Sequence, residues 1–270
     1  MKKTLEIIKP IERKRNSIKV AVFDFDGTIS TLRQGWEKIM EPLMIEMITV
    51  SVPPEQELLS KVRDYIDEST GIQTICQMYW LVSQINLYNR NPEVHDAWWY
   101  KDEYNHRLLK IVNGRTEKLL NGEISAEDYR IKGSYDFLSE LKNKGIDIYI
   151  ASGTDDSDVQ REVESVGIKQ FVKYVTGAPF RSADCSKEAV IKSLIEDQGL
   201  HGSEFVLLGD GKVEIGLGIE AEAITIGTAT DEIKRFGINE LKRKKLIKAG
   251  AHAIVGDFLN FPEILDWLGI

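Results

Sequence analysis

Cysteine is scarce in this chain of 270 residues, which contains only Cys76 and Cys185. The two lie far apart and form neither a CxxC pair nor a zinc-ligand pattern, so we expect no disulfide framework and a reducing compartment. No apolar stretch approaches the roughly 18 residues of a membrane-spanning helix, and charges interrupt each apolar run near the N-terminus. We therefore expect a cytoplasmic protein without a membrane partner.

Positive charge is also in short supply. The 35 Lys and Arg residues stand against 43 Asp and Glu residues, giving a formal net charge of -8 at pH 7. This balance disfavours nucleic acid as the main partner, although a local positive pocket can still bind a small anion. The dense basic run at 242–245 is predicted to be the outer face of a late helix. The expected partner is a small metabolite, and the oligomeric state stays open.

The sequence does contain a regular alternation of short apolar runs and helical stretches. The runs span residues 18–23, 146–151, 205–208, 223–226 and 253–255, and each ends in a polar or glycine-containing turn. Such runs are typical of buried parallel strands. Apolar residues at helical spacing predict helices over 134–144 and 186–198. The alternation predicts an α/β fold, with a Rossmann-like, mainly parallel sheet flanked by helices.

Residues 32–133 break this alternation. Helical patterns cover 36–50 and 56–66, four of the five tryptophans fall here, and no convincing strand is present. Pro42 is predicted to kink or restart the first of these helices. We predict a mainly α-helical domain at 32–133, inserted into an α/β core made of residues 1–31 and 134–270.

Polar residues stand where three of the predicted strands end. Asp24 and Asp26 follow the first strand, Ser152 and Gly153 follow the second, and Asp210 follows the third. Ligands of open parallel sheets bind at the carboxyl ends of the strands. We therefore expect these side chains to meet at one edge of the sheet.

The chemistry of this group points to a magnesium ion and a phosphate. Carboxylates gathered without histidine or thiolate suit a hard, oxygen-loving cation, which also offsets their mutual repulsion. Glu214 adds a further carboxylate, and Lys187 adds an ammonium at the start of a helix. A cation and a lysine can hold a phosphate against a carboxylate nucleophile. An aspartate can accept the phosphoryl group as an acyl phosphate.

The segment from Asp24 to Thr28, DFDGT, together with the later Ser152, Lys187 and the GDxxxE pattern ending at Glu214, resembles the haloacid dehalogenase superfamily. The likeness is to members of the phosphoglycolate phosphatase and β-phosphoglucomutase type, with a helical cap between the first and second motifs. The resemblance implies that Asp24 is the nucleophile and Asp26 the general acid and base.

The resemblance also implies roles for the remaining motif residues. Thr28 would support Asp26 or the phosphate site, and the phosphoryl group would be bound by Ser152, Gly153 and Lys187. Magnesium would be held by Asp24, the Asp26 backbone carbonyl and Asp210, with Glu214 binding it directly or through an intermediate contact. Residues 32–133 would form a mobile cap that excludes water from the site.

The acid at Asp26 disfavours dehalogenation, because the dehalogenases proper lack it. Thr28 favours hydrolysis, since phosphomutases of this superfamily often carry an apolar residue there. The expected function is a magnesium-dependent phosphatase acting on a small soluble phosphomonoester. Two alternatives stay open: a phosphomutase of a phosphorylated sugar, and a non-catalytic protein that binds a phosphorylated ligand.

Three residues of the insert are candidates for substrate specificity. Arg33 could pair with a second anionic group of the substrate, or be a solvated hinge residue. Trp36 could stack on a substrate ring, or pack within the helical domain. Gln73 could line the inner face of the cap, or lie on a solvated helix face.

Overall fold

The computed structural model describes residues 5–11, 15–184, 186–196 and 199–270. Seven strands form one sheet in the order β1-β7-β6-β5-β2-β3-β4. All neighbouring strands are parallel except β1, which is antiparallel to β7. The strands are β1 Leu5–Ile7, β2 Val20–Phe23, β3 Asp147–Asp155, β4 Tyr174–Ala178, β5 Phe205–Gly209, β6 Ile224–Thr228 and β7 Ala253–Val255. The predicted α/β fold with a mainly parallel sheet is confirmed.

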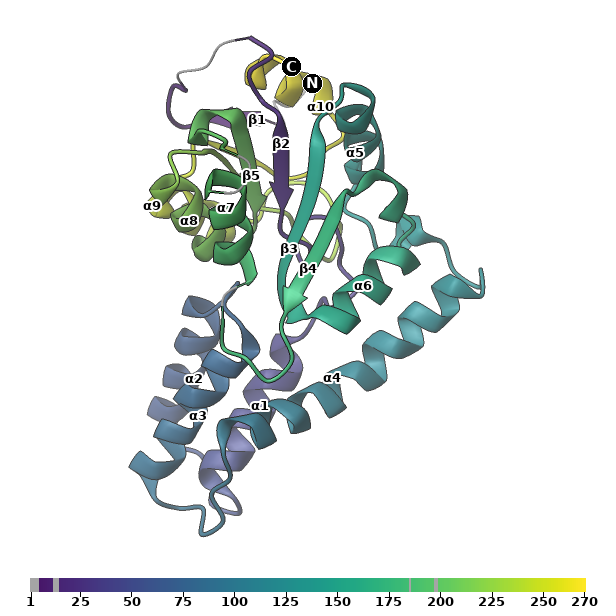
Figure 1. The fold of residues 1–270 in the computed structure, drawn as a ribbon. Helices are drawn as coiled ribbons and strands as arrows, with labels where there is room; N and C mark the ends of the chain where they lie inside the picture. Colours follow the sequence, from purple (N-terminus) through teal and green to yellow (C-terminus); the bar gives the residue numbers. More distant parts are fainter. Residues whose placement is uncertain (1–4, 12–14, 185, 197–198) are drawn as a thin grey trace.

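Helices cover both faces of the sheet (Figure 1). The helices of one face are α5 Ser134–Asn143, α6 Asp156–Ser165 and α10 Phe261–Leu268, and those of the other are α7 Ser186–Glu196, α8 Lys212–Glu220 and α9 Glu240–Ala249. Strand β2 shows why: Ala21 and Phe23 pack in the cluster of α5, α6 and α10, whereas Val20 and Val22 pack in that of α7. Alternate side chains of a strand face opposite ways, so a strand covered on both faces is apolar throughout.

The five predicted strands are all present, with ends shifted by a few residues at most. Both edge strands, β1 and β4, escaped prediction. Strand β4 carries Thr176 and Gly177 inside its apolar run, and β1 is only three residues long within a charged segment. The predicted helix 186–198 is observed as α7, and residues 197–198 lie outside the described part of the chain.

A helical region lies beyond the carboxyl ends of the strands (Figure 1). Its helices are α1 Glu37–Thr49, α2 Gln56–Glu68, α3 Thr74–Tyr88 and α4 Ala97–Leu120. Their apolar side chains form a cluster of their own, separate from the clusters around the sheet. Of the two outcomes predicted for Pro42, a restart of the helix is wrong, because α1 runs through Pro42 as one helix, and a kink stays a prediction.

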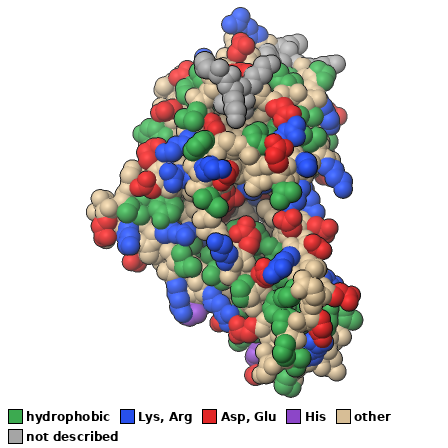
Figure 2. All heavy atoms as spheres, turned by 180° about the vertical axis from the view of Figure 1, so that it is seen from behind, with side chains coloured by type: hydrophobic (Ala, Val, Ile, Leu, Met, Phe, Trp, Pro, Cys, Tyr) green, Lys and Arg blue, Asp and Glu red, His purple; other side chains and the backbone are tan. Residues whose placement is uncertain are grey.

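Charged side chains of both signs are interspersed over the face shown in Figure 2, which views the molecule from behind. Within the described residues, no helix combines the length and the apolar character needed to span a membrane.

Candidate active site

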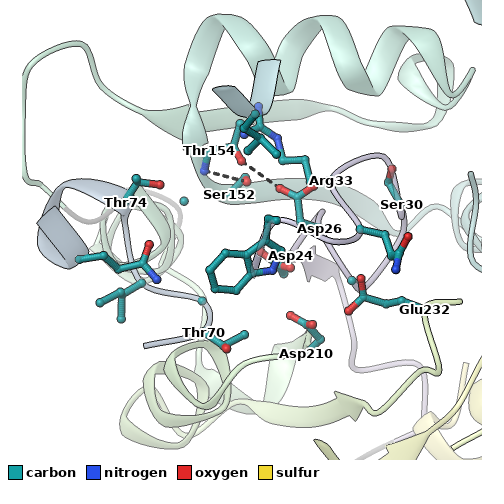
Figure 3. Close-up of a pocket in the computed structure, with 18 of the residues that line it drawn as sticks. Asp24, Asp26, Ser30, Arg33, Thr70, Thr74, Ser152, Thr154, Asp210 and Glu232 are labelled. Carbon is teal, nitrogen blue, oxygen red and sulfur yellow. Dashed lines mark hydrogen bonds between the residues drawn. The ribbon is translucent and has the colours of Figure 1, made fainter. Parts of the chain in front are cut away.

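A pocket lies where the carboxyl edge of the sheet meets the helical region (Figure 3). It encloses about 720 Å³ of space, part of which is open to solvent. Most of the predicted site residues line it, namely Asp24, Asp26, Arg33, Trp36, Ser152, Gly153, Lys187 and Asp210. Thr28, Gln73 and Glu214 do not. The structure therefore gathers residues from several strand ends and the insert around one cavity.

Asp24 is buried at the end of β2, with 5% of its surface exposed. The ammonium Nζ of Lys187 lies 2.8 Å from its Oδ1, and the hydroxyl of Thr28 donates to its Oδ2 over 3.4 Å. Burial raises the pKa of Asp24 well above its usual range; the charge of Lys187 opposes this rise, and the carboxylate of Glu214 adds to it. The contact with Lys187 provides the positive charge that a buried carboxylate needs. Thr28 thus contacts the predicted nucleophile and does not line the pocket.

Asp26 has a different environment although it lies two residues further on. The hydroxyl of Thr154, at the end of β3, donates a 2.9 Å hydrogen bond to its Oδ2 (Figure 3). Its Oδ1 is buried without a hydrogen-bond partner among the described residues. Burial raises the pKa of Asp26, whereas the charge of Arg33 and the hydrogen bond from Thr154 oppose the rise. A carboxyl group with a raised pKa is suited to carry a proton.

Lys187 is buried in the first turn of α7, as predicted. Besides Asp24 it binds Glu214 and donates to the Gly71 carbonyl over 3.3 Å. Its pKa is raised: burial alone would lower it, but the carboxylates of Asp24 and Glu214 prevail. A side chain on Gly211 would come within 2.5 Å of the Glu214 carboxylate, so the Gly leaves room for this arrangement. Glu214 is placed to orient Lys187.

Asp210 binds Lys242, which the sequence analysis predicted to lie on the outer face of a late helix. Lys242 lies 2.5 Å from Asp210 Oδ2 and also binds Glu232, which follows β6 and lines the pocket. The pKa of Lys242 is raised, since these two carboxylates outweigh the lowering by burial. The prediction that the whole run 242–245 faces outward is wrong for Lys242 and for Arg243, which binds Glu6. A basic run on a short helix necessarily places some members on its inner side.

The donor set is compatible with magnesium. No group of three or more His, Cys, Asp or Glu side chains within the described part of the chain converges as a metal site. The four predicted ligands therefore do not close around one point through side chains alone. Magnesium is usually held by one or two carboxylates together with phosphate oxygens and water. Asp24 and Asp210 meet that requirement, because both line the pocket and each is offset in this structure by an ammonium group.

The three specificity candidates differ in position. Arg33 lines the pocket, but its guanidinium is bound by Glu162 at 2.7 Å. Trp36 also lines the pocket and packs against the cluster of the helical region. Gln73 does not, and its side-chain amide donates to the Asp184 carbonyl.

Sequence reasoning assigned no role to four residues that shape the pocket or its contacts: Tyr104, Thr154, Glu162 and Glu232. Two of these residues could have been identified from their positions in the sequence. Thr154 follows Ser152 by two positions at a strand end, and Glu232 lies shortly beyond the end of β6, so the rule that found Asp210 applies to both. Tyr104 and Glu162 lie within helices, and nothing local distinguishes them.

The mainly parallel sheet, with carboxylates lining a pocket at its carboxyl edge, defines the α/β class of this protein. Residues 18–222 match the sequence profile of the haloacid dehalogenase-like hydrolases, and the chain belongs to this family. No curated protein matches the sequence.

Solved structures share the fold at low sequence identity. A predicted phosphoglycolate phosphatase from Haemophilus somnus 129PT has 16% identity and a TM-score of 0.63, over 92% of this chain and 98% of that one. The β-phosphoglucomutase of Clostridium difficile has 15% identity and a TM-score of 0.61, over 93% and 97%. A phosphonoacetaldehyde hydrolase-like protein from Oleispira antarctica has 13% identity and a TM-score of 0.63, over 97% and 96%.

Proposed function

We propose that this hydrolase is a magnesium-dependent phosphatase that cleaves a small soluble phosphomonoester through an aspartyl phosphate on Asp24. The observation that carries the proposal is the pair of unlike carboxyl groups at the end of β2. Asp24 lies against the Lys187 ammonium, whereas Asp26 has a raised pKa and one oxygen without a partner among the described residues. One is suited to attack and the other to transfer a proton.

In the first step a carboxylate oxygen of Asp24 attacks phosphorus in line with the ester oxygen. The bond from phosphorus to that oxygen breaks, and protonated Asp26 gives its proton to the leaving alcohol. The Lys187 ammonium lies beside the attacking carboxylate, where it can offset the charge of the phosphoryl oxygens. Ser152 and Gly153 line the same pocket and would bind those oxygens.

In the second step Asp26, now ionised, takes a proton from water. That water attacks the phosphorus of the aspartyl phosphate, the bond to the Asp24 oxygen breaks, and free phosphate leaves. The hydrogen bond from Thr154 holds the Asp26 carboxylate in place for both proton transfers. The carboxyl group ends the cycle protonated, as it began.

The site would hold magnesium through Asp24, Asp210 and the Asp26 backbone carbonyl. When bound, the ion supplies positive charge that lets an anionic phosphate approach an anionic nucleophile. Gly27 has a φ of +74°, and a side chain there would overlap the Asp210 carboxylate. The close approach of the β2 loop to Asp210 thus depends on a glycine at this position.

The helical region, residues 32–133, is proposed to act as the cap of this site. It contributes Arg33, Trp36 and Tyr104 to the pocket, and its Gly71 carbonyl accepts from Lys187. Closing such a region over the pocket would exclude bulk water during the first step.

The test compares the wild-type chain with Asp24→Asn on p-nitrophenyl phosphate, following nitrophenol and free phosphate. Turnover should require magnesium and should be lost in the variant. The exposed Asp147→Asn serves as the control and should retain full activity. Normal turnover by Asp24→Asn would overturn the proposal, and transfer of phosphate to an alcohol without release of free phosphate would indicate a mutase.

A further inference from the structure

The pocket contains a guanidinium whose charge is already balanced. Arg33 Nε lies 3.1 and 3.2 Å from the two Glu162 carboxylate oxygens, and its Nη2 lies 2.7 Å from Oε1. Asp158 lies 3.5 Å from the same Nη2. Arg33 and Glu162 are both buried, with 9% and 2% exposed. A second anion from a substrate would have to displace a buried, bidentate carboxylate.

No other described cation is available to such an anion. Lys187, the only other Lys or Arg that lines the pocket in the described chain, lies beside Asp24 and Glu214 and is assigned to the transferred phosphoryl group, so it does not serve a second anion. Glu232 places a further carboxylate at the pocket wall (Figure 3). An anionic group on the alcohol part of the substrate would therefore face carboxylates and already paired cations, and would lose its hydration without a partner.

The rest of the lining combines the apolar side chains of Trp36, Ile72 and Leu108 with uncharged polar groups. The hydroxyls of Ser30, Thr70 and Thr74 and the amides of Gln34 and Gln77 border the pocket. Tyr104 is the notable one, because it is only 4% exposed, lines the pocket, and makes no hydrogen bond through its hydroxyl to any described residue. The hydroxyl oxygen itself is accessible from the pocket, where water or a ligand hydroxyl can bond to it.

We infer that the pocket selects phosphomonoesters whose alcohol part is uncharged and carries hydroxyl groups, such as a polyol or a sugar. Tyr104 is a specificity-determining contact for a substrate hydroxyl. Glu162 is a positioning residue: by pairing with Arg33, it prevents the guanidinium from binding a second anion. This inference rests on the proposed function, and it excludes substrates that carry a second phosphate or a carboxylate.

Binding to Asp24→Asn, measured calorimetrically in magnesium buffer, tests the inference without turnover. The matched ligands are glycerol 1-phosphate and 3-phosphoglycerate, in which a carboxylate replaces one hydroxymethyl group, and glucose 1-phosphate and glucose 1,6-bisphosphate. In each pair, the ester whose alcohol part is uncharged should bind at least about tenfold more tightly, as for one lost charge-assisted contact. Equal or tighter binding of the esters that carry a second anionic group, or no binding of any ester, would overturn the inference.

Variants in the same background identify the residues responsible. Glu162→Gln should reduce the preference by about tenfold, because it frees the Arg33 charge, whereas Glu164→Gln on the exposed side of α6 should leave it unchanged. Tyr104→Phe should weaken the binding of glycerol 1-phosphate about three- to tenfold and leave the binding of phenyl phosphate unchanged. An unchanged preference in both variants would contradict the assigned roles.

Turnover by the wild-type chain separates the two proposals. Release of phosphate from p-nitrophenyl phosphate combined with a preference for anionic esters would overturn the inference and leave the phosphatase intact. A selective binder that releases no phosphate from any ester would overturn the phosphatase and leave the selectivity intact.

Discussion

Lys187 Nζ lies 2.8 Å from Asp24 Oδ1 and binds Glu214 at the same time, so one buried ammonium joins the predicted nucleophile to α8. The glutamate that the family pattern suggested for the metal is thereby engaged with a lysine. A chain of charges thus runs from β2 through α7 to α8 at the pocket.

This relationship predicts how Glu214→Gln behaves. If Glu214 orients Lys187, the variant should lower kcat/KM about tenfold while the affinity for magnesium, from calorimetry, stays nearly unchanged. Glu220→Gln, exposed on the same helix, is the matched control. A large loss of magnesium affinity in Glu214→Gln would show that Glu214 is a metal ligand instead.

Thr154→Val tests the hydrogen bond to Asp26. That bond favours the ionised carboxylate, so its loss should raise the pKa of Asp26 further. The first step needs protonated Asp26, and activity on alkyl esters should therefore fall as pH rises through that pKa. The falling limb of the kcat/KM profile should move to higher pH in the variant, and kcat should drop about three- to tenfold. Thr176→Val, whose hydroxyl bonds among the described residues only to the neighbouring Gly177 carbonyl, should leave the profile in place. A shift to lower pH would contradict the assignment.

Lys242→Met should have opposite effects on stability and metal binding. Without magnesium, the variant leaves Asp210 and Glu232 unpaired, which should lower the melting temperature. Without the Lys242 ammonium, magnesium has no competitor for Asp210, and the dissociation constant of magnesium should fall about tenfold. Titration of the melting temperature with magnesium measures both effects. Lys244→Met, on the exposed side of α9, should show neither, and weaker magnesium binding by Lys242→Met would be the contrary result.

Arg33→Met tests the buried pair with Glu162. Removing one partner leaves a buried carboxylate without compensation, which should cost about 3–5 kcal/mol in the free energy of unfolding. Urea unfolding measures the change. Arg63→Met is the control, because its pair with Glu41 is largely exposed and should cost less than about 1 kcal/mol. Equal losses in the two variants would contradict the structural role assigned to Arg33.

The sequence was most informative where buried strands end. Five central strands were predictable because both of their faces are covered, which makes them continuous apolar runs. Asp24, Asp26, Ser152 and Asp210 followed from their places after those strands. The edge strands β1 and β4 gave weak signals, since they are short or interrupted by polar residues and glycine.

The parts that escaped prediction depend on contacts between distant segments. Lys242 is one member of a basic run in the sequence, and only the packing of α9 against α8, β6 and β7 brings it to Asp210. Arg33 reads as a free cation until α6 brings Glu162 to it, 129 positions further along the chain. Tyr104 reads as a core aromatic of a helix, and only the fold shows that it borders the pocket.

The most direct test of Asp24 as the nucleophile uses Asp26→Asn with p-nitrophenyl phosphate. Nitrophenolate leaves without needing a proton, so the first step should proceed, whereas hydrolysis should stall because an asparagine side chain at this position does not accept a proton from water. Rapid mixing should show a burst of about one nitrophenolate per chain. Acid quench and peptide mass spectrometry should then find the phosphoryl group on Asp24. Steady turnover without a burst, or a phosphoryl group on another residue, would contradict the account.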